Sequence, residues 1–360
     1  MRSGIFMMPL HPASKDYHQV LEEDLEAIIH ADRCGLDEVW LGEHFSCQTE
    51  PITSPLMFMA QAIPQTSTIK LCSGVLNLPQ QHPAVVAGFA AMFDHLCKGR
   101  FVMGIGPGGL PSDFELFHLN DAMQRGRMML ESIDIIHKLW TEDPPHSIRG
   151  EYWQIEQPDW HVPEFGLGVF PRPYQKPWPP VAIASMSPFP FLAKEAAGRG
   201  WSVVSANFIP EDSVATHWQR YVQGCEEAGI EPDGANWRVA RTILVTETDA
   251  EAERYLQRPD CAPRYYFDYL SSLMKKAGFS QVMKGLRKDM SDADLTPDWC
   301  VNEVVIAGSP ATVADRINAL RSRLGPFGTI VLGGIDWDDK PLWRNSMKLF
   351  AEQVVPKLDG

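Results

Sequence analysis

The sequence carries little positive charge for its length. Lys and Arg number 32 against 46 Asp and Glu among 360 residues, which gives a formal net charge of −14. Nucleic-acid binding needs a basic stripe that neutralises phosphates, and none is present. No apolar run is long enough to cross a bilayer, and the N-terminus has no signal-peptide pattern. We therefore expect a cytoplasmic protein that engages neither nucleic acid nor membrane.

Disulfide and metal patterns are also missing. The 7 cysteines are scattered without a C-x-x-C pair, and the 11 histidines include no H-E-x-x-H motif. Such scattered thiols fit reduced cysteines in a cytoplasmic enzyme better than a disulfide framework or a zinc site. No bound metal is expected.

Apolar segments instead alternate with segments of helical spacing. The segments 20–34 and 127–140 repeat apolar residues at the helical period, and Gly35 ends the first. Continuous apolar strands indicate burial on both faces, as in a parallel sheet covered by helices. The sequence predicts one α/β domain over 1–360, a (β/α)₈ TIM barrel, with a doubly wound sheet as the alternative. The expected strands are 4–8, 38–41, 70–75, 100–104, 181–184, 202–205, 239–246 and 329–332.

Two segments exceed what a barrel needs. Residues 141–176 begin with a hairpin pattern and continue with a run rich in proline and aromatic residues. Residues 258–302 are rich in Tyr, Phe, Met and Lys. Long loops in a compact domain are usually lids or mobile segments. We expect both to be insertions, the second forming a roof.

A possible acid/base pair follows the second expected strand. Gly42 ends that strand and is followed at once by Glu43, His44 and Phe45. In a parallel barrel the C-terminal end of a strand is where chemistry takes place. An imidazole with a near-neutral pKa suits proton delivery. The alternative is a histidine in an ordinary loop.

A glycine-rich stretch follows the fourth expected strand. Residues 104–109 fit G-x-G-x-x-G. A dinucleotide fold is disfavoured, because 110–113 is not an immediate helix start and no strand ending in an acid follows about 20 residues later. We expect a loop that lets a planar ligand or a phosphate approach the backbone, with a plain tight turn as the alternative.

Several polar residues suit an anionic, ring-shaped ligand. Arg125 and Arg127 open a helix, where the helix dipole disfavours cations unless an anion binds. Ser187 follows the fifth strand and precedes a helix, where hydroxyl and backbone groups can hold phosphate. Asn77 ends the third strand and offers both donor and acceptor to a ring edge. The alternatives are a solvated basic turn, a helix cap and a turn-forming asparagine.

These motifs together resemble the bacterial luciferase-like family of flavin-dependent monooxygenases over nearly the whole chain. Within that family, 4–12 and 110–113 are most similar to the limonene 1,2-monooxygenase-like branch. The resemblance rests on motifs at 4–7, 42–45, 78–83, 99–108, 125–127 and 308–310, in the order that the family has them.

The resemblance implies a TIM barrel that binds reduced FMN, ahead of FAD or F420, at the C-terminal ends of its strands. It implies a C4a-peroxyflavin formed with O₂, a separate NAD(P)H-dependent flavin reductase, a small apolar substrate and a homodimer. Epoxidation, hydroxylation and Baeyer–Villiger insertion all stay open. An F420-dependent dehydrogenase and a non-catalytic flavin-binding protein are the alternatives.

The resemblance also assigns roles to residues. His44 would be the proton shuttle at the flavin ring with Glu43 beside it, and the Gly74–Val75 peptide would be a non-proline cis bond behind the ring. Light-emitting members carry cysteine and arginine where this chain has Gly106 and Pro107, so luminescence is not expected. The expected flavin contacts are Gly74, Val75, Asn77, Gly106, Arg127 and Ser187, and the expected apolar substrate wall is Met8, Phe45 and Phe114.

Overall fold

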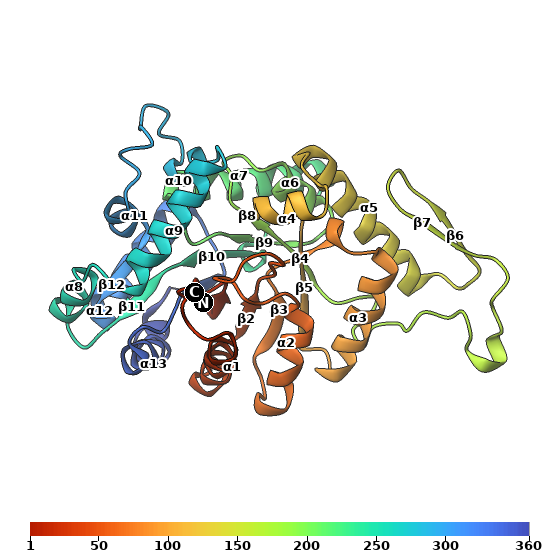
Figure 1. Ribbon diagram of the computed structural model, residues 1–360, viewed down its shortest axis with the longest axis horizontal. Coiled ribbons are helices and arrows are strands. Elements are labelled where there is room, and N and C mark those ends of the chain that lie inside the picture. Colours follow the sequence, from red (N-terminus) through yellow and green to blue (C-terminus); the bar gives the residue numbers. More distant parts are fainter. Residues whose placement is uncertain (360) are drawn as a thin grey trace.

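The computed structural model describes residues 1–359 and contains a closed barrel of parallel strands ringed by helices (Figure 1). The pairing between β3 and β5 closes the sheet. The predicted (β/α)₈ barrel is therefore confirmed, and the doubly wound alternative is wrong because the sheet has no open edge. In chain order the barrel strands are β1 (Arg2–Met7), β2 (Glu38–Leu41), β3 (Lys70–Ser73), β5 (Phe101–Gly106), β8 (Val181–Ser185), β9 (Ser202–Ser205), β10 (Trp237–Arg241) and β13 (Thr329–Gly334).

Two of the expected strands are divided. The expected strand 239–246 breaks after Arg241, and β11 (Ile243–Val245) leaves the barrel to pair with β12 (Ile306–Gly308). Arg241 and Thr242 interrupt the apolar residues at this point, but both are buried, and the sequence prediction took the segment as one strand. The expected strand 70–75 ends at Ser73, and the short β4 (Leu76–Asn77) pairs with β5.

Helix ends follow the expected signals. Gly35 ends α1 in the left-handed conformation with φ 81°, and the Ser309 side chain accepts a hydrogen bond from the backbone N–H of Thr312 to cap α12. No helix among residues 1–359 combines the length and apolarity that a membrane crossing requires. The helices are α1 (Tyr17–Cys34), α2 (Pro55–Ala62), α3 (Pro83–Leu96), α4 (Pro111–Leu116), α5 (Ala122–Thr141), α6 (Phe191–Gly198), α7 (Glu211–Ala228), α8 (Asp249–Leu256), α9 (Ala262–Lys276), α10 (Gln281–Lys284), α11 (Pro297–Val304), α12 (Pro310–Leu324) and α13 (Lys340–Leu349).

The barrel interior combines small apolar side chains with one buried ion pair. Arg238 donates to the two carboxylate oxygens of Glu38 at 2.7 and 2.8 Å, and Trp40 Nε1 donates to the same carboxylate at 3.0 Å. A buried charge requires such partners. Glu38 begins β2, whereas His44 follows the end of β2, so this pair lies at the opposite end of the barrel from the expected site.

The two extra segments take different forms. In the first, β6 (His146–Arg149) and β7 (Gln154–Gln157) form the predicted hairpin, in an arm that extends away from the barrel at the right of Figure 1. The second contains α9, α10 and α11 rather than loops alone. Tyr266, Leu270 and Met274 recur at helical spacing and are buried, which explains why α9 forms.

Candidate active site

A cavity of about 440 Å³ opens at the C-terminal ends of the barrel strands. The loops after β2, β3, β5, β8 and β9 contribute to its wall, and α9 covers one side. This is the end of the barrel where the sequence placed the chemistry. Nine of the expected site residues line the cavity: Met8, Glu43, His44, Gly74, Val75, Asn77, Gly106, Arg127 and Ser187.

Phe45 and Phe114 lie outside the set of described residues that line the cavity. Phe45 is 36% exposed and packs edge-on against Phe117, with ring centroids 5.2 Å apart. Phe114 is buried beneath the Arg125 guanidinium, 3.5 Å from the ring centroid. Each ring is packed against another side chain, and its role in the substrate wall stays a prediction. The apolar wall comes instead from Phe6, Leu10, Phe208, Leu270, Leu273 and Met274, among others.

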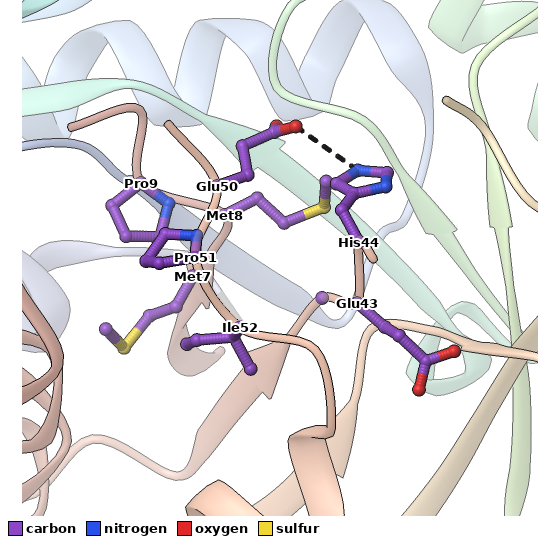
Figure 2. Close-up of a pocket in the computed structure, with 9 residues that line it drawn as sticks. Met7, Met8, Pro9, Glu43, His44, Glu50, Pro51 and Ile52 are labelled. Atoms are coloured by element: carbon purple, nitrogen blue, oxygen red, sulfur yellow. Dashed lines mark ion pairs between the residues drawn. The ribbon is translucent and has the colours of Figure 1, made fainter. Parts of the chain in front are cut away.

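His44 lies between two carboxylates. Its Nε2 is 3.4 Å from Glu50 Oε2, the pair marked in Figure 2, and its Nδ1 is 3.6 Å from Asp113 Oδ2, an ion-pair distance too long for a hydrogen bond. Burial alone would lower the pKa of His44, but the charges of Glu50 and Asp113 outweigh it and raise the pKa. The imidazole is thus held toward its protonated form.

Sequence reasoning missed both carboxylates. His44 donates its backbone N–H to the Ile52 carbonyl at 3.0 Å, and this closure of the loop brings Glu50 opposite the imidazole. Asp113 accepts from the backbone N–H groups of Phe45 and Ser46 at 3.1 and 2.9 Å. The available signals were the acid at the end of the 42–50 loop and the acid in the first turn of α4.

Glu43 ties two strand ends together. Its carboxylate accepts from the Asn77 backbone N–H at 3.1 Å and from Gln81 Nε2 at 3.3 Å. Burial raises the pKa of Glu43 to about 7, against the opposing effect of these donors. Asn77 Nδ2 in turn donates to the Glu43 carbonyl at 3.1 Å. One of the two N–H donors of the Asn77 amide is therefore engaged within the protein, which leaves the second donor and the carbonyl oxygen for a ligand.

The floor of the cavity contains the expected unusual backbone. The Gly74–Val75 peptide bond is cis. A Cβ atom at Gly106 would lie 2.5 Å from Val75 Cγ2, so only glycine permits this close approach. The departure from cysteine at position 106 thus has a steric reason in this chain.

The glycine-rich loop leads into a short helix. Leu110, which follows the last glycine, is extended, and α4 begins at Pro111. Proline is favoured in the first turn, and Asp113 there complements the helix dipole. A helix of six residues that begins after Leu110 still differs from a dinucleotide motif, in which the glycines open the helix directly.

Polar groups at the outer end of the cavity suit an anion. Arg127, in the second turn of α5, lines the cavity while its Nε donates to Tyr152 OH at 2.8 Å. Ser187 lies just before α6, and Ser185 Oγ is buried without a hydrogen-bond partner among the described residues. Arg125 is not available there, because it donates to the Leu119 carbonyl at 2.6 Å.

Known proteins share the sequence pattern of this chain. Residues 1–326 match the family of luciferase-like monooxygenases. The 4-hydroxyprotoasukamycin monooxygenase of Streptomyces nodosus subsp. asukaensis is 32% identical over 99% of this chain and 92% of its own length. Limonene 1,2-monooxygenase of Rhodococcus erythropolis is 31% identical over 99% of this chain and 86% of its own. An F420-dependent glucose-6-phosphate dehydrogenase of Amycolatopsis mediterranei is 26% identical over 93% of this chain and 93% of its own length.

A solved structure is similar over the whole chain. It is the oxygenating constituent of 3,6-diketocamphane monooxygenase from Pseudomonas putida, a type II Baeyer–Villiger monooxygenase in complex with FMN. The TM-score is 0.89 at 29% identity, with 100% of this chain and 99% of that chain covered. The resemblance predicted from the sequence motifs is confirmed, and the chain belongs to the luciferase-like monooxygenase family of oxygenases.

Proposed function

We propose that the protein is a two-component monooxygenase that uses reduced FMN and O₂ to oxygenate a small apolar organic molecule. The observation that carries this proposal is the cavity itself, where a buried imidazole between two carboxylates faces a predominantly apolar wall. The structural neighbour bound to FMN supports the choice of cofactor. A separate NAD(P)H-dependent flavin reductase would supply the reduced flavin, and we assign both components to the cytoplasm.

The residues present fit FMN. Ser185 Oγ is buried and has no hydrogen-bond partner within residues 1–359, so a ligand that donates to it or accepts from it would satisfy this hydroxyl. In the proposal the ring system lies along Gly74, Val75, Asn77 and Gly106. The phosphate lies at Arg127 and Ser187, near the N-terminal end of α6. Reduced FMN, when bound, supplies the electrons that activate O₂.

The protein's own part in the reaction is proton control and the exclusion of water. His44 would hold a proton at its ring nitrogens and deliver it once within the closed cavity. Glu43 would position the loop that carries His44, through its bonds to Asn77. The face of α9 with Leu270, Leu273 and Met274 would keep the cavity dry.

The apolar wall favours a small molecule of terpenoid character or similar polarity. Two of the relatives are named for such substrates, limonene and diketocamphane. The proposal covers epoxidation, hydroxylation and Baeyer–Villiger insertion, because each would use the same cavity and the same oxygen source.

The test is isotope transfer. With photoreduced FMN, ¹⁸O₂ and limonene or 2,5-diketocamphane as probes, the protein should place one ¹⁸O atom in the product. His44→Ala should lower product yield by about 10²–10⁴-fold, the usual contribution of a proton-transfer group. His18→Ala, at an exposed position of α1, is the matched control. Anaerobic hydride transfer with F420, or tight FMN retention without O₂ consumption, would instead support the two alternatives.

We also propose a homodimer. Four apolar side chains of α3 form one outward stripe: Val85, Phe89, Met92 and Leu96 are between 45% and 56% exposed. The arm beside it is tied to α3 where His95 Nε2 meets the Arg172 carbonyl at 3.0 Å. That arm exposes Trp160, Phe165, Leu167, Val169 and Tyr174. An apolar patch of this extent is typical of a contact between subunits.

A further inference from the structure

We infer that Glu50 is a second proton-holding group of the cavity, which shares a proton with His44 and returns one to it after each transfer. This inference rests on the proposed monooxygenase function and adds a positioning and proton-supplying residue to it.

Glu50 reaches the cavity from the far side of the β2–α2 loop. In Figure 2 its carboxylate points toward the imidazole of His44, while the neighbouring Pro51 and Ile52 turn away. The facing atoms, Glu50 Oε2 and His44 Nε2, are 3.4 Å apart, and the two side chains are 11% and 9% exposed. Both residues line the same cavity.

The two carboxylates beside His44 have different surroundings. Asp113 receives two backbone N–H groups and the Ser46 hydroxyl, and these donors together with His44 lower its pKa in spite of burial. Asp113 is therefore the permanent anion that orients the ring. Glu50 receives no backbone donor among the described residues, and burial raises its pKa while His44 and Cys47 oppose the rise.

The charge balance favours one mobile proton. Glu43, Glu50 and Asp113 surround a single imidazole, so full ionisation would leave the group with excess negative charge in a mainly apolar cavity. The other titratable groups facing Glu50 are Cys47, Tyr266 and Tyr269, all neutral near pH 7 because burial raises the pKa of each. Titration of His44 and Glu50 is thus a property of the pair.

The proton step balances within the pair. Protonated His44 gives the proton on Nε2 to the reactants and becomes neutral. The Glu50 carboxylate then takes a proton from solvent when the cavity opens for product release and gives it to Nε2, which restores the imidazolium beside a carboxylate.

The experiment measures the His44 pKa by NMR of histidine-labelled protein without flavin. In Glu50→Gln, which keeps the side-chain shape, the His44 resonance should titrate at lower pH than in the parent. Glu231→Gln, an exposed carboxylate in the loop after α7, should leave that titration unchanged. Circular dichroism and FMN affinity, both expected to match the parent, establish that the variant is folded.

Turnover supplies the second readout. Product formed per reduced FMN should fall by roughly tenfold or more in Glu50→Gln, as for other proton-transfer groups, with the loss greatest at high pH. Glu50→Asp should recover part of it. An unchanged His44 titration in folded Glu50→Gln would overturn the inference even if the parent oxygenates substrate. Failure of the parent to incorporate ¹⁸O would overturn the proposed function and leave the NMR result standing.

Discussion

His11 lies outside the cavity wall and is held between Asp24 and Asp336, with Nε2 3.1 Å from Asp24 and Nδ1 2.6 Å from Asp336. Burial opposes its charge, yet the two carboxylates raise the pKa of His11 from 6.5 to about 9. The folded protein therefore binds this proton more tightly than the unfolded chain. The resulting stabilisation is complete below about pH 6.5 and is lost as the pH rises through about 9.

The first prediction concerns this pH dependence. At about 1.4 kcal/mol per pH unit, the stabilisation lost across that window is on the order of 3 kcal/mol. Urea unfolding from pH 6 to pH 10, in steps of about one unit, should show the loss in the parent and not in His11→Gln. His18→Gln, at an exposed site of α1, should behave as the parent. A parent and His11→Gln with equal slopes would contradict the assignment.

Gly106 gives a second prediction at the residue scale. Since a Cβ there would collide with Val75 Cγ2, Gly106→Ala should destabilise the fold by about 1–3 kcal/mol, the usual cost of overpacking. It should also weaken FMN binding, because relief of the collision moves the cavity floor. Gly88→Ala on α3 has no atom within 4 Å of the new Cβ and should instead stabilise by roughly 0.5–1 kcal/mol. Thermal unfolding measures the stability of both variants and FMN titration measures their affinity; a Gly106→Ala variant as stable as the parent would contradict the prediction.

At the scale of elements, the sequence predicts helices and strands best where apolar and capping residues follow a regular pattern. The barrel strands were predicted because they are continuous apolar runs, which indicate burial on both faces. The end of α1 and the start of α12 were predicted because Gly35 and Ser309 are common capping residues. The division between β10 and β11 was missed because two polar residues, Arg241 and Thr242, were taken as part of one continuous strand. The α9 helix was hidden among aromatic residues that also suit a loop.

The site shows the same limit. Residues at or shortly after the end of a strand, such as His44, Asn77 and Ser187, could be assigned to one end of the barrel from the sequence alone. Glu50 and Asp113 could not, because their place beside His44 depends on how the 42–52 loop folds back and where α4 begins. Sequence spacing carries no information about such closure.

The third prediction concerns α9 as a roof. Leu273 lines the cavity and is only partly buried, so Leu273→Ala should leave the fold intact while it admits water. A wetter cavity diverts reduced flavin and O₂ to hydrogen peroxide. The ratio of peroxide to oxygenated product should rise several-fold. Ser272 is one position away and exposed, so Ser272→Ala should leave the ratio of peroxide to product unchanged. Equal ratios in the two variants would show that α9 does not exclude water from the cavity.

At the scale of the whole molecule, the stripe on α3 and the arm 142–176 form one side that the barrel does not need for its own core. The arm projects from the barrel in Figure 1, yet it is fixed at both ends, by Tyr152 on Arg127 and by the Arg172 carbonyl on His95. Because the arm is anchored in this way, little conformational entropy would be lost when it contacts a partner subunit. Its contact with Arg127 would also connect subunit association to the proposed phosphate position.

The fourth prediction follows from that side of the molecule. A stable dimer buries about 800 Å² per subunit. Lysines introduced at the centre of such an interface would face the same lysines of the other subunit and repel them. The double variant Phe89→Lys/Met92→Lys should therefore be a monomer by light scattering at about 10 µM, where we expect the parent to be a dimer with a concentration-dependent Tm. Phe279→Lys, at an exposed apolar residue after α9, should remain dimeric. If dissociation also weakens FMN binding, the arm connects subunit association to FMN binding through Arg127. A double variant that stays dimeric would show that the subunits meet at another surface. A monomeric parent would contradict the proposed homodimer.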